Sequence, residues 1–255
     1  MPSLRIVLLL LALCVPCCAF AAQQSSSLSD LQQFSTIENA MPFGDSSEPG
    51  EIQSYLRSIQ AKLAKTPVSE RAETLKDVSD QTKWGTYQRF VAYYVCAWYG
   101  VNYNRTRDYL IHTAFWWEWG IGPQSQRPFS FDDVCIYMLY VLYEHNHDFK
   151  ILHDILTTKS DAGTSQLIVC FTERAIAKHP RGVLHVAEMS EKGRDLAWKL
   201  LHLSPDDENH PLYILYYTEE SLKTFRIYVT RVANDPEDPL CALAKGLLKK
   251  PAGGC

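Results

Sequence analysis

The chain has 255 residues, a formal net charge of -4 and eight cysteines, and 46% of its residues are hydrophobic. A chain of this length can bury one good-sized core or the cores of two small domains. Its mild acidity and its lack of a Lys/Arg block argue against nucleic acid as a natural partner.

The first 22 residues have the three-part pattern of a secretory signal peptide. Arg5 supplies the positive charge, residues 6–15 form the apolar run, and Ala19, Ala21 and Ala22 provide small residues at a cleavage site. We expect cleavage after Ala21 or Ala22, and therefore a secreted or periplasmic protein. Removal of the only charged residue in this segment, Arg5, makes the mature chain slightly more acidic.

Two other interpretations of this segment are open. A membrane anchor would need roughly 20 consecutive apolar residues, and this run is shorter and ends at Pro16. A bacterial lipoprotein would be cut before Cys14, Cys17 or Cys18, but the residues before these cysteines are poor matches to the small residue that such processing prefers. No later stretch approaches the length of a membrane span, so we expect no transmembrane segment after cleavage.

The mature chain would keep five cysteines, at positions 96, 135, 170, 241 and 255. An odd number in an oxidising compartment leaves at least one thiol unpaired or bonded to another molecule. Cys96, Cys135 and Cys170 lie in apolar helical runs, where a cysteine usually serves as a small hydrophobic residue. Cys255 ends a Pro-Ala-Gly-Gly tail and is a candidate for pairing with Cys241 or for an intermolecular disulfide.

Residues 23–50 are rich in Ser and Gln and predict a flexible leader or linker, with one short helix near 28–40. From Ile52 onward apolar residues recur every three or four positions, so residues 51–255 are predicted to form a helical domain. The predicted helices are 51–64, 67–79, 83–100, 105–119, 131–145, 148–158, 161–178, 181–189, 192–203, 206–217, 220–233 and 237–249.

Helix-start signals mark several of these boundaries. Thr66-Pro67, Ser204-Pro205 and Asp235-Pro236 each place a capping side chain before a proline that suits the first helical position. The connections are short, which makes consecutive helices antiparallel neighbours. The predicted fold is therefore all-α, either an irregular α-solenoid of HEAT or TPR character or a compact helical bundle. No residue-level repeat at 34 or 40–47 residues supports the first alternative.

Aromatic residues are concentrated between Trp84 and Tyr143. Consecutive side chains on a helix project about 100° apart, so one buried face cannot hold Trp116, Trp117 and Trp119 together. We therefore predict a ligand-binding surface for a protein or glycan, because exposed Trp and Tyr supply large rigid contact area. Its candidate residues are Trp116, Trp117, Trp119, Trp98 and Tyr103. The alternative is a large aromatic core with one ring at the surface.

Glu118 is the candidate catalytic residue. It lies among Phe115, Trp116, Trp117 and Trp119, and apolar surroundings raise the pKa of a carboxyl group as a general acid requires. Asp132, Asp133 or Glu144 are candidates for the second carboxylate of a glycan-active hydrolase or lyase. The alternative is a solvated or ion-paired helix residue.

Metal-capable side chains gather between Glu144 and Asp154, where the candidate ligands are His145, His147 and His153. The alternative places His145 at the end of one helix and Asp148 at the start of the next. The His-Glu-x-x-His motif is absent, and we expect no cofactor.

Asn104-Arg105-Thr106 is a glycosylation sequon, with Asn104 as a helix N-cap as its alternative. Neither Gly-x-Ser-x-Gly nor any nucleophile signature around Cys170 occurs, so the sequence offers no support for a serine or cysteine hydrolase.

Together these patterns favour a non-enzymatic interaction or scaffold protein that binds a protein or glycan through residues 84–143. The competing hypothesis is a glycan-active enzyme that uses Glu118 as its general acid. The first depends on the helical rhythm and the surplus of aromatic residues, and the second on a carboxylate pair about a cleft.

Overall fold

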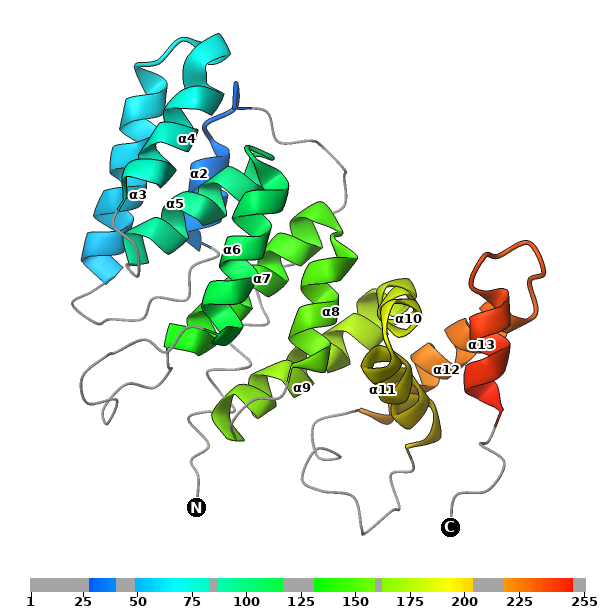
Figure 1. Ribbon diagram of the computed structural model, residues 1–255. Helices are drawn as coiled ribbons and strands as arrows, with labels where there is room; N and C mark the ends of the chain where they lie inside the picture. The colour runs from blue at the N-terminus through cyan, green and yellow to red at the C-terminus, as the bar shows by residue number, and fades with distance from the viewer. Residues whose placement is uncertain are drawn as a thin grey trace. The chain divides into compact units, whose positions relative to one another are not determined.

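The computed structural model describes residues 28–39, 49–82, 87–116, 131–158, 162–203 and 218–249. Every regular element in these ranges is a helix, so the all-α prediction is confirmed (Figure 1). The elements are α2 (Gln33–Asn39), α3 (Pro49–Ala64), the 3-10 helix η1 (Val68–Glu70), α4 (Arg71–Gln81), α5 (Tyr87–Trp98), α6 (Tyr103–Trp116), α7 (Phe131–Asn146), α8 (Phe149–Thr157), α9 (Ala162–Lys178), α10 (Pro180–Met189), α11 (Glu191–His202), α12 (Glu219–Ala233) and α13 (Cys241–Leu248).

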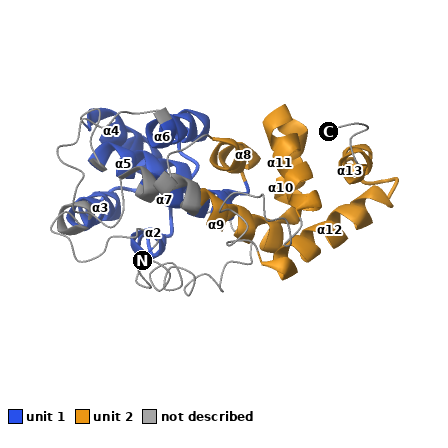
Figure 2. Cartoon of the chain, turned by 90° about the horizontal axis from the view of Figure 1, so that it is seen from below, with its two compact units in different colours: residues 1–147 blue, residues 148–255 orange. Residues whose placement is uncertain are grey.

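The chain divides into two compact units, Met1–His147 and Asp148–Cys255 (Figure 2). The division falls within the stretch predicted as one helical domain, at the junction between α7 and α8. His147 has a φ of 54°, a left-handed conformation that ends α7. The side chain of Asp148 then accepts a hydrogen bond from the backbone N–H of Lys150, at 2.9 Å, and caps α8 as expected.

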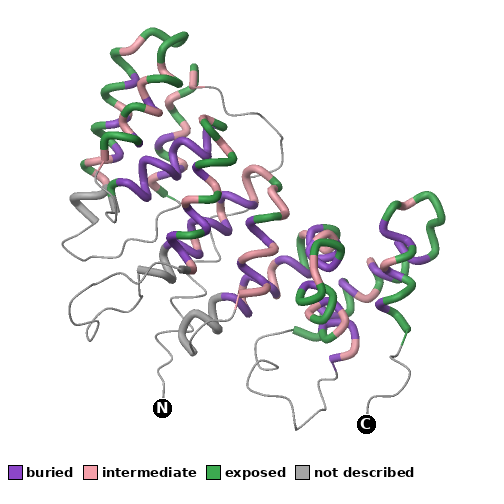
Figure 3. The backbone as a smooth tube through the Cα atoms, viewed as in Figure 1, coloured by how far each residue is buried: buried purple, intermediate pink, exposed green. Residues whose placement is uncertain are grey.

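In unit 1, each described helix contacts the next one along the chain, and α3 and α7 also contact α5. Helix α5 therefore lies at the centre of unit 1. It is buried without interruption from Phe90 to Trp98 (Figure 3). A helix that is apolar on all sides must be covered on all sides. The helices α3, α4, α6 and α7 provide that cover.

In unit 2, more pairs of helices that are not consecutive in the chain contact each other than in unit 1. Besides consecutive contacts, α12 packs against α9 and α11 packs against α8, so helices three places apart in the chain also meet. Helices α10 and α11 approach each other closely at Gly193, where an added Cβ atom would lie 2.1 Å from the backbone oxygen of Val186. Only glycine allows two helix backbones to come this near.

The leader predicted at 23–50 contains a folded segment. Phe34 and Ile37 of α2 are buried in unit 1. Side chains of the following helices also bind its backbone: Arg71 Nη1 donates to the carbonyl of Leu28 at 2.6 Å, and the Tyr99 hydroxyl donates to the carbonyl of Asp30 at 3.1 Å. Residues 28–39 therefore pack onto unit 1, because Phe34 and Ile37 are buried there and the carbonyl groups of Leu28 and Asp30 accept hydrogen bonds from its side chains.

Two predicted helix starts are wrong. The Thr66 hydroxyl donates back to the carbonyl of Lys62, at 2.9 Å, so it closes α3 instead of capping the next helix. Asp235 accepts from the backbone N–H of Glu237 at 3.0 Å and forms a turn, and α13 begins only at Cys241. An Asp-Pro pair suits a turn as well as a helix start, which is why the sequence pattern misplaced this boundary.

None of the helices that the structure describes is both long and apolar enough to cross a membrane. The predicted signal peptide at 1–22 and the tail that carries Cys255 lie outside the described residues, as does the predicted helix at 206–217. Within the described part, Cys96 and Cys241 are buried and direct their thiols to the backbone carbonyls of Leu75 and Ala233.

Candidate functional site

The structure separates the residues predicted to bind a partner. Trp117, Trp119 and Glu118 lie outside the described residues, and Trp116 ends α6 with a side chain that also lies outside them. Trp98 ends α5 and Tyr103 begins α6. Trp116 is thirteen positions after Tyr103 in α6, which corresponds to roughly 20 Å at 1.5 Å per residue. The two residues therefore lie at opposite ends of this helix.

Trp98 is a core residue. Its side chain is buried, its indole N–H donates to Gln33 Oε1 at 2.9 Å, and its ring stacks on His145 with centroids 3.9 Å apart. Because the Trp98 side chain is buried and both its N–H group and its ring contact other residues of the unit, Trp98 is not available to a partner. Tyr103 is half-buried, and the guanidinium of Arg107 lies 5.7 Å from the centroid of its ring.

The carboxylate pair predicted for glycan chemistry is Glu118 with Asp132, Asp133 or Glu144, and Glu118 lies outside the described residues. Asp132 and Asp133 lie in the first turn of α7, and their side chains are also outside the described set. Glu144 is half-buried near the end of the same helix. The carboxylate pair therefore stays a prediction.

The three candidate metal ligands have other roles. His145 stacks on Trp98, and burial lowers the pKa of its imidazole. His147 belongs to unit 1 and His153 to unit 2. Both ring nitrogens of His153 are engaged in hydrogen bonds. Across the described ranges, no group of three or more His, Cys, Asp or Glu side chains is placed to hold a metal ion.

The alternative interpretation of Asn104 is also corrected. Helix α6 begins at Tyr103, so Asn104 lies inside its first turn and is not the N-cap. The residue before the helix is Asn102, which adopts a left-handed φ of 48° that asparagine tolerates. Asn104 is exposed on the surface of unit 1.

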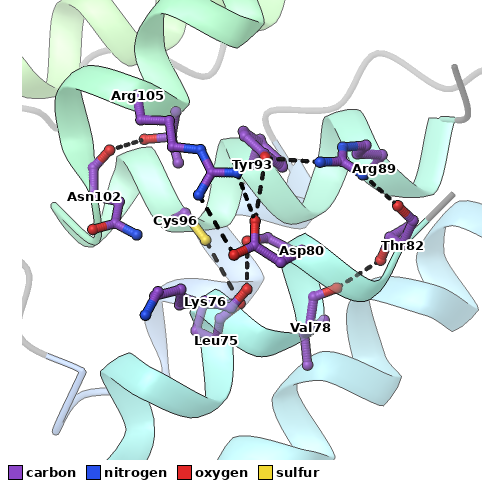
Figure 4. A network of polar contacts seen from close by, with 12 residues as sticks. Leu75, Lys76, Val78, Asp80, Thr82, Arg89, Tyr93, Cys96, Asn102 and Arg105 are labelled. Carbon is purple, nitrogen blue, oxygen red and sulfur yellow. Dashed lines mark hydrogen bonds and ion pairs between the residues drawn. The ribbon is translucent and has the colours of Figure 1, made fainter. Parts of the chain in front are cut away.

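A polar network joins α4, α5 and α6 in unit 1 (Figure 4). Arg89 is 3% exposed, and it donates to the carbonyl of Thr82 at 2.7 Å and to the hydroxyl of Tyr93 at 2.9 Å. At the outer edge, Arg105 lies 3.1 Å from Asp80 Oδ1. Burying a guanidinium is costly unless it is hydrogen-bonded, so these two bonds from Arg89 offset part of that cost. Its role is to hold α4 against α5.

Unit 2 contains a second polar cluster, built from α8 and the start of α11. The hydroxyl oxygen of Ser190 lies 2.8 Å from His153 Nε2, and His153 Nδ1 lies 2.8 Å from Asp154 Oδ1. All three side chains are partly exposed, at 20% for His153 and 25% for Asp154. A serine, a histidine and an aspartate in this order form the hydrogen-bond chain of a serine nucleophile, which is recognised by geometry on unrelated folds.

Sequence patterns do not predict this cluster. They indicate His153 only as a candidate metal ligand, and the chain lacks the Gly-x-Ser-x-Gly motif of a serine nucleophile. Ser190 and His153 are 37 positions apart, so their contact depends on how α8 meets α11. The only local signals were the neighbouring pair His153-Asp154 and a serine at a helix start.

Comparisons with known proteins assign no function to this cluster. The chain matches no protein-family model, and neither the curated proteins nor the solved structures contain a significant match to it.

Proposed function

We propose that this chain is an exported α-helical interaction protein that binds a protein or glycan through its aromatic-rich segment, residues 84–143. The observation that carries the proposal is the arrangement of unit 1, in which α2 to α7 pack in chain order around the buried helix α5. Helical arrays of this kind present extended surfaces that can bind a partner.

Unit 1 is an irregular array of paired helices in this proposal. Most of its contacts join a described helix to the next or to the next but one, as in helical solenoids, although the Trp98–Gln33 hydrogen bond also joins α5 to α2. Unit 2 differs in having more contacts between helices that are not consecutive, among them those of α9 with α12 and of α8 with α11. The array character is therefore proposed for unit 1 alone.

Export rests on the signal-peptide pattern of the first 22 residues. N-terminal sequencing of the protein recovered from its own host tests it. A mature chain that begins at Ala22 or Gln23 is the expected result. A chain that still begins at Met1 or Pro2 would contradict export through this pathway.

The binding surface proposed here centres on Trp117 and Trp119, since Trp98 is in the core and Tyr103 lies at the far end of α6. The test compares wild-type protein with the double variant Trp117→Ala/Trp119→Ala after mild crosslinking, with partners identified by mass spectrometry. The double variant should lose the partner that the wild type recovers in near-equal amount, while its helical circular-dichroism signal is unchanged.

Ile227→Ala provides the matched control. Ile227 is 61% exposed on α12 in unit 2, so its truncation also removes an exposed apolar side chain but leaves residues 84–143 intact. This variant should retain the partner. Equal recovery of the partner by the wild type and the tryptophan double variant would refute the proposed surface.

A further inference from the structure

We propose that unit 2 carries an ester-cleaving site in which Ser190 is the nucleophile, His153 its general base and Asp154 the positioning residue for the imidazole. The proposal is independent of the partner-binding surface, because it concerns α8, α10 and α11 and uses no residue of unit 1. Its substrates would be carboxylic esters with a small apolar acyl group.

The hydrogen bonds allow the tautomer that a serine nucleophile needs. When the carboxylate of Asp154 accepts across 2.8 Å, the proton is on His153 Nδ1. The lone pair of Nε2 can then accept from the hydroxyl of Ser190 across 2.8 Å. This is the tautomer that removes a proton from serine as the oxygen attacks a carbonyl carbon.

The position of Ser190 favours negative charge on its oxygen. Ser190 is the N-cap of α11, and its Oγ accepts a hydrogen bond from the backbone N–H of Gly193 at 3.0 Å. The positive end of the helix dipole lies at the same place. The first N–H groups of a helix have no acceptor within it, and in the proposed site those of Glu191 and Lys192 would supply the donors for the oxyanion of the acyl intermediate.

The neighbouring surface suits an apolar acyl group. Met189 directly precedes Ser190 and is 48% exposed, which makes it one of the few large apolar side chains that the described residues present to solvent. A flexible, polarisable methionine adapts to acyl chains of different shape. The partial exposure of His153 and Asp154 leaves the cluster accessible from outside.

Helix capping alone does not account for the cluster. Thr218 caps α12 in the same manner, with its Oγ1 accepting from the backbone N–H of Ser221 at 3.2 Å. Its hydroxyl, however, donates to Glu173 at 2.8 Å, and a carboxylate does not form a base-and-orienter pair as His153 and Asp154 do. Thr218 is therefore a natural control for the capping role of Ser190.

The reaction balances with water as the only co-reactant. Ser190 Oγ bonds to the ester carbonyl carbon while its proton passes to His153 Nε2. The carbon–oxygen bond to the alcohol then breaks, and the imidazolium returns that proton to the departing alkoxide. Water, deprotonated by His153, attacks the acyl-serine, and the carboxylic acid leaves as Ser190 regains its proton.

Two measurements on the purified protein test the site. The first is labelling with a fluorophosphonate probe, followed by peptide mass spectrometry. The probe should modify Ser190 in the folded wild-type protein. Labelling of a different residue only, or no labelling, would overturn the proposal whatever the behaviour of any variant.

The second measurement is hydrolysis of p-nitrophenyl butyrate by variants. Ser190→Asn keeps a good helix cap but has no nucleophile, so the rate should fall about a hundredfold or more while the circular-dichroism spectrum is unchanged. Asp154→Asn should lower kcat and leave KM unchanged, and added imidazole should restore part of the activity lost in His153→Ala. Thr218→Asn should hydrolyse the ester at the wild-type rate, and an equal rate for Ser190→Asn would refute the site.

Discussion

Gly193 offers a quantitative test of the packing between α10 and α11. A Cβ atom at this position would lie 2.1 Å from the carbonyl oxygen and 2.7 Å from the carbonyl carbon of Val186. Ordinary contact begins near 3.4 Å, so Gly193→Ala must push the two helix backbones apart by more than 1 Å. Overpacking of this kind costs about 1–3 kcal/mol, against a gain in helix propensity of at most about 1 kcal/mol.

Gly246 is the matched control, because a Cβ atom added there would meet no atom within 4 Å. Gly246→Ala in α13 should therefore stabilise the protein by up to about 1 kcal/mol. The assay is urea unfolding followed by circular dichroism, with both variants and the wild type measured side by side. Opposite signs for the two substitutions are the expected result. A Gly193→Ala protein as stable as the wild type would refute the close approach of α10 and α11.

Three further predictions follow from unit 1. Burial lowers the pKa of His145 below 6.5, so as the pH falls below that value the unfolded chain binds a proton that the native state does not. The free energy of unfolding should therefore drop between pH 7 and pH 5, and His145→Gln should show a smaller drop in urea titrations. Burial raises the pKa of the Cys96 thiol to about 12, so iodoacetamide should modify Cys96 only after denaturation, and modification in native buffer would contradict its burial. Arg71→Ala removes the donor to the carbonyl of Leu28 and should cost about 1 kcal/mol, with faster proteolysis at residues 28–32; an unchanged cleavage pattern would show that this bond does not hold the segment.

Much of the fold follows from local patterns. The predicted helix 148–158 corresponds to α8 at Phe149–Thr157, and the predicted helix 181–189 corresponds to α10 at Pro180–Met189. Boundaries were accurate where a single side chain caps the helix, as Asp148 does. They failed at Asp235-Pro236, where the same residue types form a turn before α13.

Trp98 shows why part of the binding-site prediction was wrong. Trp98 is a candidate for the ligand-binding surface because it lies in the aromatic-rich segment. The structure buries it between Gln33 and His145, and Gln33 lies in the segment expected to be a flexible leader. The periodicity of one helix shows its apolar face, but not which other segment will cover that face.

The sequence by itself determined the secondary structure, because the 3.6-residue period, the caps and the prolines act within a few residues of one another. Only the tertiary structure decided the separation into two units and the buried position of Arg89. It also brought Ser190 to His153 across 37 positions. Such contacts depend on how whole helices pack, and at α10 and α11 that packing depends on the missing Cβ atom of Gly193.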